Sequence, residues 1–321
     1  MEVADKRNES AHFNINEENY GLLNGKMVQC IWDFYQSRQN GDVHQLAVAN
    51  DLLDNIAENI FSIDGYDYAN GLAGVGFAIE WLAQNGYIDC DTDEILGEID
   101  DEIYKSVVYS KSTNHSLLEG TTGKAYYFYK RLMSTNPSKT RYKQICLIEC
   151  LILLSDELTD YLMDQEIGLC STKSLEDISD QEIMNMCHIL ILFEKILKKR
   201  INVEAIRSGI CGISKFIERI CLERNSGDLP FNALPLVYSH TVVGIKLGDP
   251  IWQSKSKLTY KIFSSLSRPE DANEIYDFMV GELSQSIQEN DTEVKTAVLP
   301  NNLTSLLMLS GDEIAELMLL K

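Results

Sequence analysis

Apolar residues recur along most of this chain at intervals of three and four positions, the spacing of one face of an amphipathic helix. One such stripe follows Gly71. The longest stripe consists of five isoleucines: Ile206, Ile210, Ile213, Ile217 and Ile220. The sequence lacks the sustained alternation of apolar and polar residues that would predict strands. The pattern therefore predicts an all-α fold.

Glycines mark the helices at nearly regular intervals. Gly25, Gly71 and Gly120 each stand where a new apolar pattern begins, and they lie 46 and 49 residues apart. A period of this length is typical of repeat proteins in which each repeat is a pair of helices. Glycine at the start of the first helix of a pair allows neighbouring backbones to approach closely. Such pairs predict either an open superhelix or a closed α/α ring.

The repeat is less regular in the second half of the chain. Either Cys187–Leu197 or the segment containing Gly209 and Gly212 fits the opening of a later first helix, and the spacing alone does not decide between them. No linker rich in Pro, Gly or Ser divides the chain. We therefore predict a single domain over residues 16–321, preceded by a mobile N-terminus at residues 1–15.

Charge and cysteine content narrow the possible partners and compartment. The 321 residues carry a formal net charge of −21, which disfavours nucleic acid and anionic lipid because both attract clusters of Lys and Arg. The eight cysteines include no CxxC pair, and the first ten residues lack the apolar stretch of a signal peptide. The apolar runs are too short to span a membrane. We expect a cytoplasmic protein with reduced thiols and no membrane insertion.

The segment at residues 71–104, GLAGVGFAIEWLAQNGYIDCDTDEILGEIDDEIY, resembles the lanthionine synthetase C (LanC-like) family in its Bacteroidetes-type form. The similarity extends from about Gly21 to the C-terminus and weakens after about residue 135. It implies an α/α toroid, a double ring of inner and outer helices. The family's activity is the zinc-dependent addition of a peptide Cys thiol to a dehydroamino acid. Zinc is a suitable catalyst because it binds the thiol as a nucleophilic thiolate.

Aligned with the family, this chain lacks the expected zinc ligands. The position of the first Cys ligand falls near Pro230, and the adjacent Cys and His ligands fall near Gly281 and Glu282. Proline and glycine have no side-chain donor, and one carboxylate does not make a zinc site. Asn302 also stands where the last repeat of the family has a glycine. We therefore expect no zinc and no other cofactor.

One family feature is retained in the alignment. His188 matches an active-site His of the family, although Ile189 replaces the glycine that follows it. This match makes residues 187–197 an inner helix and residues 203–221 its outer partner, and it gives His188 as the candidate catalytic residue. Cys187 and His188 together resemble a displaced zinc pair, but a buried Cys beside a structural His explains them more simply, because adjacent helical residues face different ways.

Two further residues are candidates for substrate binding. Tyr126 belongs to the aromatic segment AYYFYKR, which fits either a peptide groove or the hydrophobic core. His240 lies on a predicted inner helix as a polar residue that would line the ring.

These observations lead to three hypotheses. The first is a degenerate LanC-like protein, a pseudoenzyme that binds a peptide or a partner enzyme of lanthipeptide biosynthesis. The second is an active cyclase that uses non-standard ligands from Cys187, His188, His240 and Glu282. The third is a carbohydrate-active enzyme with an α/α barrel, which would need two carboxylates across a cleft. No distinctive motif holds such a pair, and the ligand losses favour the first hypothesis.

Overall fold

The structure is a computed structural model that describes residues 18–23, 25–174, 177–223 and 233–264. These residues form helices joined by loops, with no strand among them, which confirms the predicted all-α fold. The elements in chain order are α1 (Lys26–Asn40), α2 (Val43–Glu58), η1 (Ile60–Ser62), α3 (Leu72–Gln84), α4 (Thr92–Ile95), α5 (Gly97–Tyr109), α6 (Thr121–Met133), α7 (Arg141–Met163), α8 (Leu169–Thr172), α9 (Asp180–Lys198), α10 (Val203–Glu223), α11 (Leu234–Leu247) and α12 (Pro250–Ser264).

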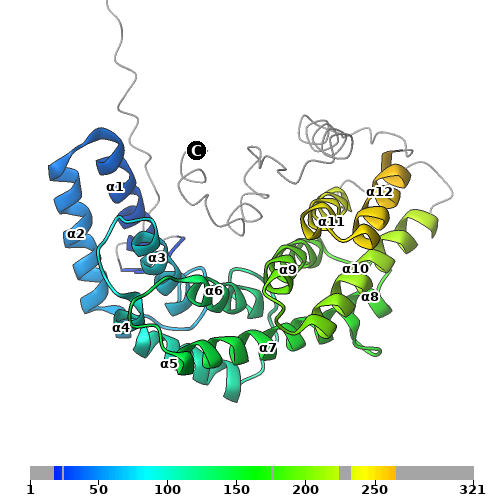
Figure 1. Cartoon of the computed structure of the whole chain (residues 1–321), viewed down its shortest axis with the longest axis horizontal. Helices are drawn as coiled ribbons and strands as arrows, with labels where there is room; N and C mark the ends of the chain where they lie inside the picture. The colour runs from blue at the N-terminus through cyan, green and yellow to red at the C-terminus, as the bar shows by residue number, and fades with distance from the viewer. Residues whose placement is uncertain (1–17, 24, 175–176, 224–232, 265–321) are drawn as a thin grey trace, which may run out of the picture.

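The helices form two layers of an arc. Helices α1, α3, α6, α9 and α11 line its concave side, and α2, α5, α7, α10 and α12 lie on its convex side (Figure 1). Each inner helix contacts an outer helix that follows it, and neighbouring inner helices contact one another. The described part is therefore an array of helix pairs, as the glycine spacing predicts. Closure into a toroid stays a prediction, because residues 265–321 lie outside the described part.

The first three inner helices begin at the predicted glycines. Gly25, Gly71 and Gly120 are the N-cap residues of α1, α3 and α6, and all three have extended backbone. A Cβ atom on Gly71 would overlap the backbone of Asp67, and one on Gly120 would overlap the backbone of Asn114. These glycines are thus required because the preceding loop folds back against the helix start, as predicted from close backbone approach.

Helix α9 begins earlier than predicted. The sequence comparison places its start near Cys187, whereas α9 starts at Asp180. Ser179 and Glu182 form a capping box there, in which each side chain accepts a hydrogen bond from the backbone of the other residue. His188 consequently lies in the third turn of an inner helix rather than at its N-terminus. The outer partner of α9 is α10, so Gly209 and Gly212 lie within an outer helix.

The hydrophobic core lies between the two layers. All five isoleucines of the stripe predicted in α10 are at most 5 % exposed. Leucines of α7 at the predicted helical spacing are buried as well: Leu147, Leu151, Leu154 and Leu158. Helical periodicity in the sequence therefore identified the faces by which these outer helices pack against the inner layer.

A buried ion network joins the second and third helix pairs. Arg131 of α6 donates to Glu80 of α3 at 2.5 Å, to Asp93 of α4 at 3.1 Å and to Asp100 of α5 at 2.7 Å. The Arg131 side chain is 1 % exposed. Burial alone would lower the pKa of Arg131, but its hydrogen bond to Asp100 and the surrounding negative charges raise it. One guanidinium therefore holds three carboxylates from three different elements.

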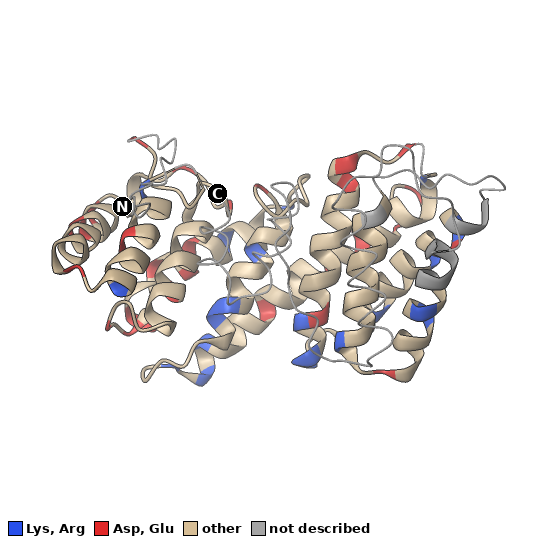
Figure 2. Cartoon of the chain, turned by 90° about the horizontal axis from the view of Figure 1, so that it is seen from above, with Lys and Arg blue, Asp and Glu red and all other residues tan. Residues whose placement is uncertain are grey.

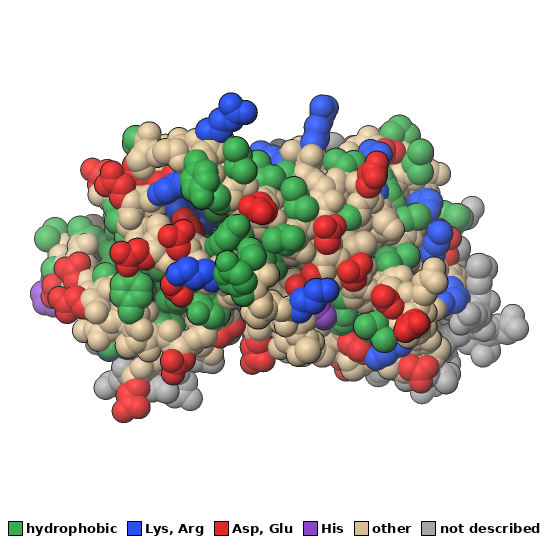
Figure 3. All heavy atoms as spheres, turned by 90° about the horizontal axis from the view of Figure 1, so that it is seen from below, with side chains coloured by type: hydrophobic (Ala, Val, Ile, Leu, Met, Phe, Trp, Pro, Cys, Tyr) green, Lys and Arg blue, Asp and Glu red, His purple; other side chains and the backbone are tan. Residues whose placement is uncertain are grey.

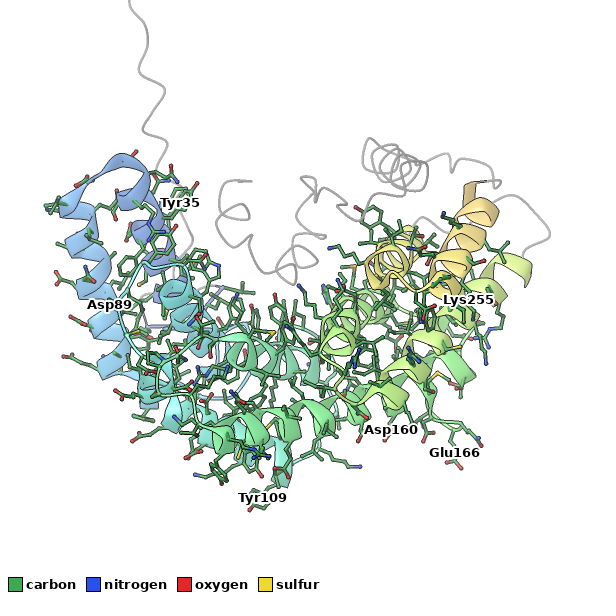
Figure 4. All side chains as sticks on the ribbon, in the orientation of Figure 1. Tyr35, Asp89, Tyr109, Asp160, Glu166 and Lys255 are labelled. Atoms are coloured by element: carbon green, nitrogen blue, oxygen red, sulfur yellow. The ribbon has the colours of Figure 1, made fainter. Side chains whose placement is uncertain are left out.

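The convex side carries charged and apolar side chains intermixed (Figure 3). Several large apolar residues of α5 and α7 are exposed there: Val108, Tyr109, Tyr142, Ile145, Ile152 and Leu153. Tyr109 and Asp160 mark this side in Figure 4, whereas Tyr35 of α1 lies near the concave side. No helix within the described ranges is long and apolar enough to cross a membrane.

Candidate functional site on the inner helices

The candidate catalytic residue His188 and its neighbour Cys187 are buried in α9. His188 is 4 % exposed and Cys187 is fully buried. Burial lowers the pKa of His188 to about 4. Burial also raises the pKa of Cys187 to about 12, although the nearby Ser239 of α11 partly opposes this shift. At neutral pH the pair is therefore an uncharged imidazole beside a protonated thiol, which suits neither general acid–base catalysis nor nucleophilic attack.

His240 is buried where α11 meets α12. Its side chain is 1 % exposed, and neither ring nitrogen has a hydrogen-bond partner among the residues that the structure describes. The backbone oxygen of His240 accepts a hydrogen bond from Ser256 of α12 at 3.3 Å. Burial, and then the charge of Lys255 (labelled in Figure 4), lower the pKa of His240 to about 4. In this conformation His240 offers almost no surface to a ligand, so the binding role predicted for it has no geometric support.

Tyr126 of α6 is part of an aromatic cluster in the core. Its side chain is 2 % exposed. Its ring centroid lies 5.4 Å from that of Phe77 and 5.9 Å from that of Tyr68, distances typical of packed aromatic pairs. The structure thus shows the core packing that was one of two interpretations of AYYFYKR. The role of Tyr126 in a peptide groove stays a prediction.

The three family ligand positions, Pro230, Gly281 and Glu282, lie outside the described residues. Within the described ranges no three His, Cys, Asp or Glu side chains are grouped so that they could hold a metal ion. The displaced pair Cys187 and His188 therefore has no third ligand in that part of the chain.

The prediction of site residues from the sequence did not include a group of lysines at the C-terminal ends of the inner helices. Lys130 is in the last turn of α6, Lys195 and Lys198 are in the last turn of α9, and Lys246 is in the last turn of α11. Burial lowers the pKa of Lys195 to about 8, with Glu194 opposing and the other three lysines adding to the shift. The charges of Lys130, Lys198 and Lys246 are therefore close enough to act on Lys195.

A second polar group lies at the other end of α6. The Nδ1 atom of His115 is 3.6 Å from a carboxylate oxygen of Glu157, and the hydroxyl of Thr121 donates to the same oxygen at 2.6 Å. The His115 ring lies against that of Tyr161, with centroids 4.2 Å apart. Burial lowers the pKa of His115, against the opposing charge of Glu157. These contacts fix the loop before α6 to α7, which gives the group a structural role.

No protein-family model matches the chain, and no match was found among curated proteins. The relation to the LanC-like family therefore stays a prediction from the resemblance over residues 71–104.

Proposed function

We propose that this chain is a degenerate LanC-like protein of a lanthipeptide or related modified-peptide pathway. It binds a peptide or a partner enzyme and does not catalyse zinc-dependent ring closure. The resemblance over residues 71–104 supports the family, and the helix pairs with glycine-capped inner helices agree with it. We place it in the cytoplasm, a proposal supported by seven cysteines of the described part that form no disulfide there: Cys30, Cys90, Cys146, Cys150, Cys170, Cys187 and Cys211.

The observation that carries this proposal is the state of the one retained family residue. His188 is buried, and burial holds the pKa of its side chain near 4. An acid–base catalyst works best when its pKa lies near the operating pH and when it reaches the substrate. His188 meets neither condition. Cys187, another candidate of the cyclase hypothesis, is also inaccessible.

A dehydrated precursor peptide tests the proposal directly. The probe is a fluorescein-labelled synthetic peptide that contains one dehydroalanine and one free Cys. We expect its fluorescence anisotropy to rise with protein concentration while its thiol remains open to alkylation, as read by mass spectrometry. A zinc-containing cyclase of the family serves as the positive control for loss of the thiol.

Metal analysis and two variants separate binding from catalysis. Metal analysis of the purified protein should give much less than about one zinc per chain, the content of a catalytic zinc site. The variants Cys187→Ala and His188→Ala should bind the peptide as the wild type does. Loss of the peptide thiol that depends on Cys187 or His188 would establish the cyclase instead, and absence of any binding would overturn the proposal.

A further inference from the structure

Helix α7 has apolar residues on two opposite faces, and the described part of the chain covers one of them. Its leucines on one face are buried against the inner layer. On the other face Tyr142, Ile145 and Ile152 form a second stripe at helical spacing, with Leu153 beside it, and all four side chains are exposed. A helix with apolar residues on opposite faces is usually covered on both. The second face of α7 is therefore suited to a partner.

This exposure is particular to α7 and is not a general property of the outer helices. Helix α10 is the next outer helix and contacts α7. Its Phe216 and the five isoleucines of its stripe are buried, whereas Arg207 and Lys215 are exposed. An outer helix of this array thus needs one apolar face, and the second face of α7 has no counterpart in α10.

Helix α5 lies beside α7 and extends the exposed face. The hydroxyl of Tyr104 donates to the Glu149 carboxylate at 3.3 Å, and a Cβ atom on Gly97 would lie 3.9 Å from Lys143 Nζ. The two helices therefore run side by side in the same direction. Val108 follows Tyr104 by one turn, so we expect it next to the part of α7 that follows Glu149.

Tyrosines are the most exposed apolar residues of the two helices. Tyr109 is 82 % exposed and Tyr142 is 75 % exposed. Tyr109 lies at the outer edge of the convex side (Figure 4), and apolar side chains gather near the middle of this side (Figure 3). Exposed apolar patches mark interaction sites, and tyrosine is enriched at protein interfaces. We call six residues the α5–α7 face: Val108, Tyr109, Tyr142, Ile145, Ile152 and Leu153.

Carboxylates along the face indicate the charge of the partner. Glu149 and Asp156 are exposed and lie about one helical turn on either side of Ile152, so they belong to the same side of α7. They accept hydrogen bonds from Tyr104 at 3.3 Å and from Asn202 at 2.7 Å. Both donors are neutral, so these bonds do not offset either negative charge.

Basic side chains on the two helices are fewer than acidic ones. Asp101 of α5 and Asp160 of α7 are exposed as well. The exposed basic residues of α5 and α7 are Lys105 and Arg141, and Lys105 forms an ion pair with Glu102 at 2.6 Å. The α5–α7 face is thus an apolar surface in negative surroundings. Charge complementarity favours a partner that places Lys or Arg next to apolar residues.

We propose that the α5–α7 face is the docking surface for a basic amphipathic helix of a partner protein. The apolar side of that helix packs on Tyr142, Ile145 and Ile152, and its Lys or Arg side chains reach Glu149 and Asp156. The stripe from residue 142 to residue 153 is about 16 Å long, which matches about three turns of a partner helix.

A second copy of this chain is a poorer occupant of the face. It would bring the same carboxylates to the contact, and each copy carries a formal net charge of −21. The inference goes beyond the proposed function and does not rest on it, because no residue of the face enters the argument for peptide binding. Failure of either proposal therefore leaves the other standing.

A model amphipathic helix tests the inference. The probe is a fluorescein-labelled peptide with Leu on one side and Lys on the other, about 18 residues long so that an isolated helix can form. One control has the same residues in an order that abolishes the apolar side, and a second has Glu in place of Lys. At about 150 mM NaCl, where long-range attraction is screened, we expect each control to bind at least about tenfold more weakly than the probe.

Matched charge variants separate docking from general attraction. Acidic positions are distributed along the whole length of the described structure (Figure 2), so a basic peptide is attracted to more than one region. We expect E149Q/D156N to weaken binding of the probe about tenfold. The control D51N/D54N removes two charges from exposed positions of α2 and should have little effect. Equal effects of the two variants would overturn the inference.

Matched apolar variants test the other half of the proposed contact. Y142Q/I145Q replaces two exposed residues of the face by a polar residue of good helix propensity, and we expect it to weaken binding about tenfold. V43Q/V48Q makes the same change at exposed apolar positions of α2 and should bind the probe as the wild type does. Unchanged binding by Y142Q/I145Q would overturn the inference.

A measurement on the wild-type protein guards against variants that fail to fold. A probe with a benzophenone side chain in place of one Leu is irradiated with the protein, and the crosslinked segments are identified by mass spectrometry. We expect crosslinks within residues 98–109 and 141–156. Crosslinks found mainly in other helices would place the peptide elsewhere and overturn the inference.

Sedimentation of the protein alone tests the alternative occupant. We expect a monomer at micromolar concentrations, because like charges oppose self-association. A dimer that Y142Q/I145Q converts to a monomer would show that a second copy covers the α5–α7 face, and it would overturn the proposal of a basic partner.

Discussion

At the scale of single residues, burial decides what the polar side chains of this protein can do. Arg131 is buried and pairs with the buried carboxylates of Glu80 and Asp93 and the partly exposed carboxylate of Asp100, whose charges it compensates. His188 and His240 are buried, and burial is the main reason that both pKa values fall. Lys195 is half-buried, and burial lowers its pKa to about 8. Burial thus gives a structural ion pair network, two neutral imidazole rings and an amine of lowered pKa.

Replacement of Arg131 should destabilise the fold strongly. Arg131→Met leaves Glu80 and Asp93 buried without their cation, and breaking such a group costs roughly 3–5 kcal/mol in the free energy of unfolding. Arg131→Lys keeps the charge but loses the forked geometry, so we expect an intermediate loss. Urea unfolding followed by circular dichroism measures both. The control is Arg38→Met, which removes exposed hydrogen bonds to backbone oxygens and should cost less. Equal losses for Arg131→Met and Arg38→Met would contradict the prediction.

His240 should make stability depend on pH between about 6.5 and 4. Its pKa is about 4 in the folded protein and 6.5 at its ordinary value, so in this interval the unfolded chain binds a proton that the folded protein does not. The contribution of His240 is therefore complete above pH 6.5 and is lost as the pH falls towards 4, by about 1.4 kcal/mol for each unit of pKa shift.

The variant His240→Asn isolates this effect from the titration of carboxylates. We expect the free energy of unfolding of the variant to fall less steeply than that of the wild type between pH 6.5 and 4. His44→Asn, at an exposed position of α2, is the matched control and should follow the wild type. A slope for His240→Asn identical to that of the wild type would show that His240 is not held neutral.

At the scale of elements, helix starts were predictable where a glycine is required sterically and were misplaced where it is not. Gly71 and Gly120 mark the starts of α3 and α6 because the preceding loops leave no room for a side chain. Helix α9 starts instead at a capping box formed by Ser179 and Glu182. Both residues of the capping box can be seen in the sequence, but the alignment with the family, which has a glycine at position 189, placed the helix start near Cys187 instead.

Two glycine substitutions in helices should have opposite effects. At Gly74, in the first turn of α3, a Cβ would overlap the backbone oxygen of Tyr68. Gly74→Ala should therefore cost roughly 1–3 kcal/mol, despite the higher helix propensity of alanine. At Gly97, the first residue of α5, the nearest atom to a new Cβ is Lys143 Nζ at 3.9 Å. Gly97→Ala should stabilise the protein by about 0.5–1 kcal/mol. Thermal unfolding of both variants shows whether each substitution raises or lowers the stability. Destabilisation by Gly97→Ala would contradict the steric argument.

At the scale of the whole molecule, the two main features are the arc of paired helices and the strongly negative net charge. The arc presents one layer of helices to its concave side and another to its convex side (Figure 1). The whole chain carries a formal net charge of −21, which favours the unfolded state through self-repulsion.

Salt should therefore stabilise the protein as a whole. Raising NaCl from about 10 to about 150 mM shortens the screening length from about 30 to about 8 Å and weakens the repulsion between surface carboxylates. We expect the melting temperature measured by calorimetry to rise over this range. KCl at the same concentrations should have the same effect, because screening does not depend on the identity of the ion. A fall in melting temperature would mean that attractive ion pairs outweigh the overall repulsion.

The sequence by itself determined the helical class, the pairing of helices and the faces that pack together. These properties depend on local spacing: an apolar residue every three or four positions and a glycine where the backbone must approach closely. Tertiary structure alone decided the chemistry of the polar residues. The pKa of His188 depends on what surrounds it, and the convergence of Lys130, Lys195 and Lys246 depends on three helices meeting side by side. Residues so far apart in the chain acquire common properties only when the fold brings them together.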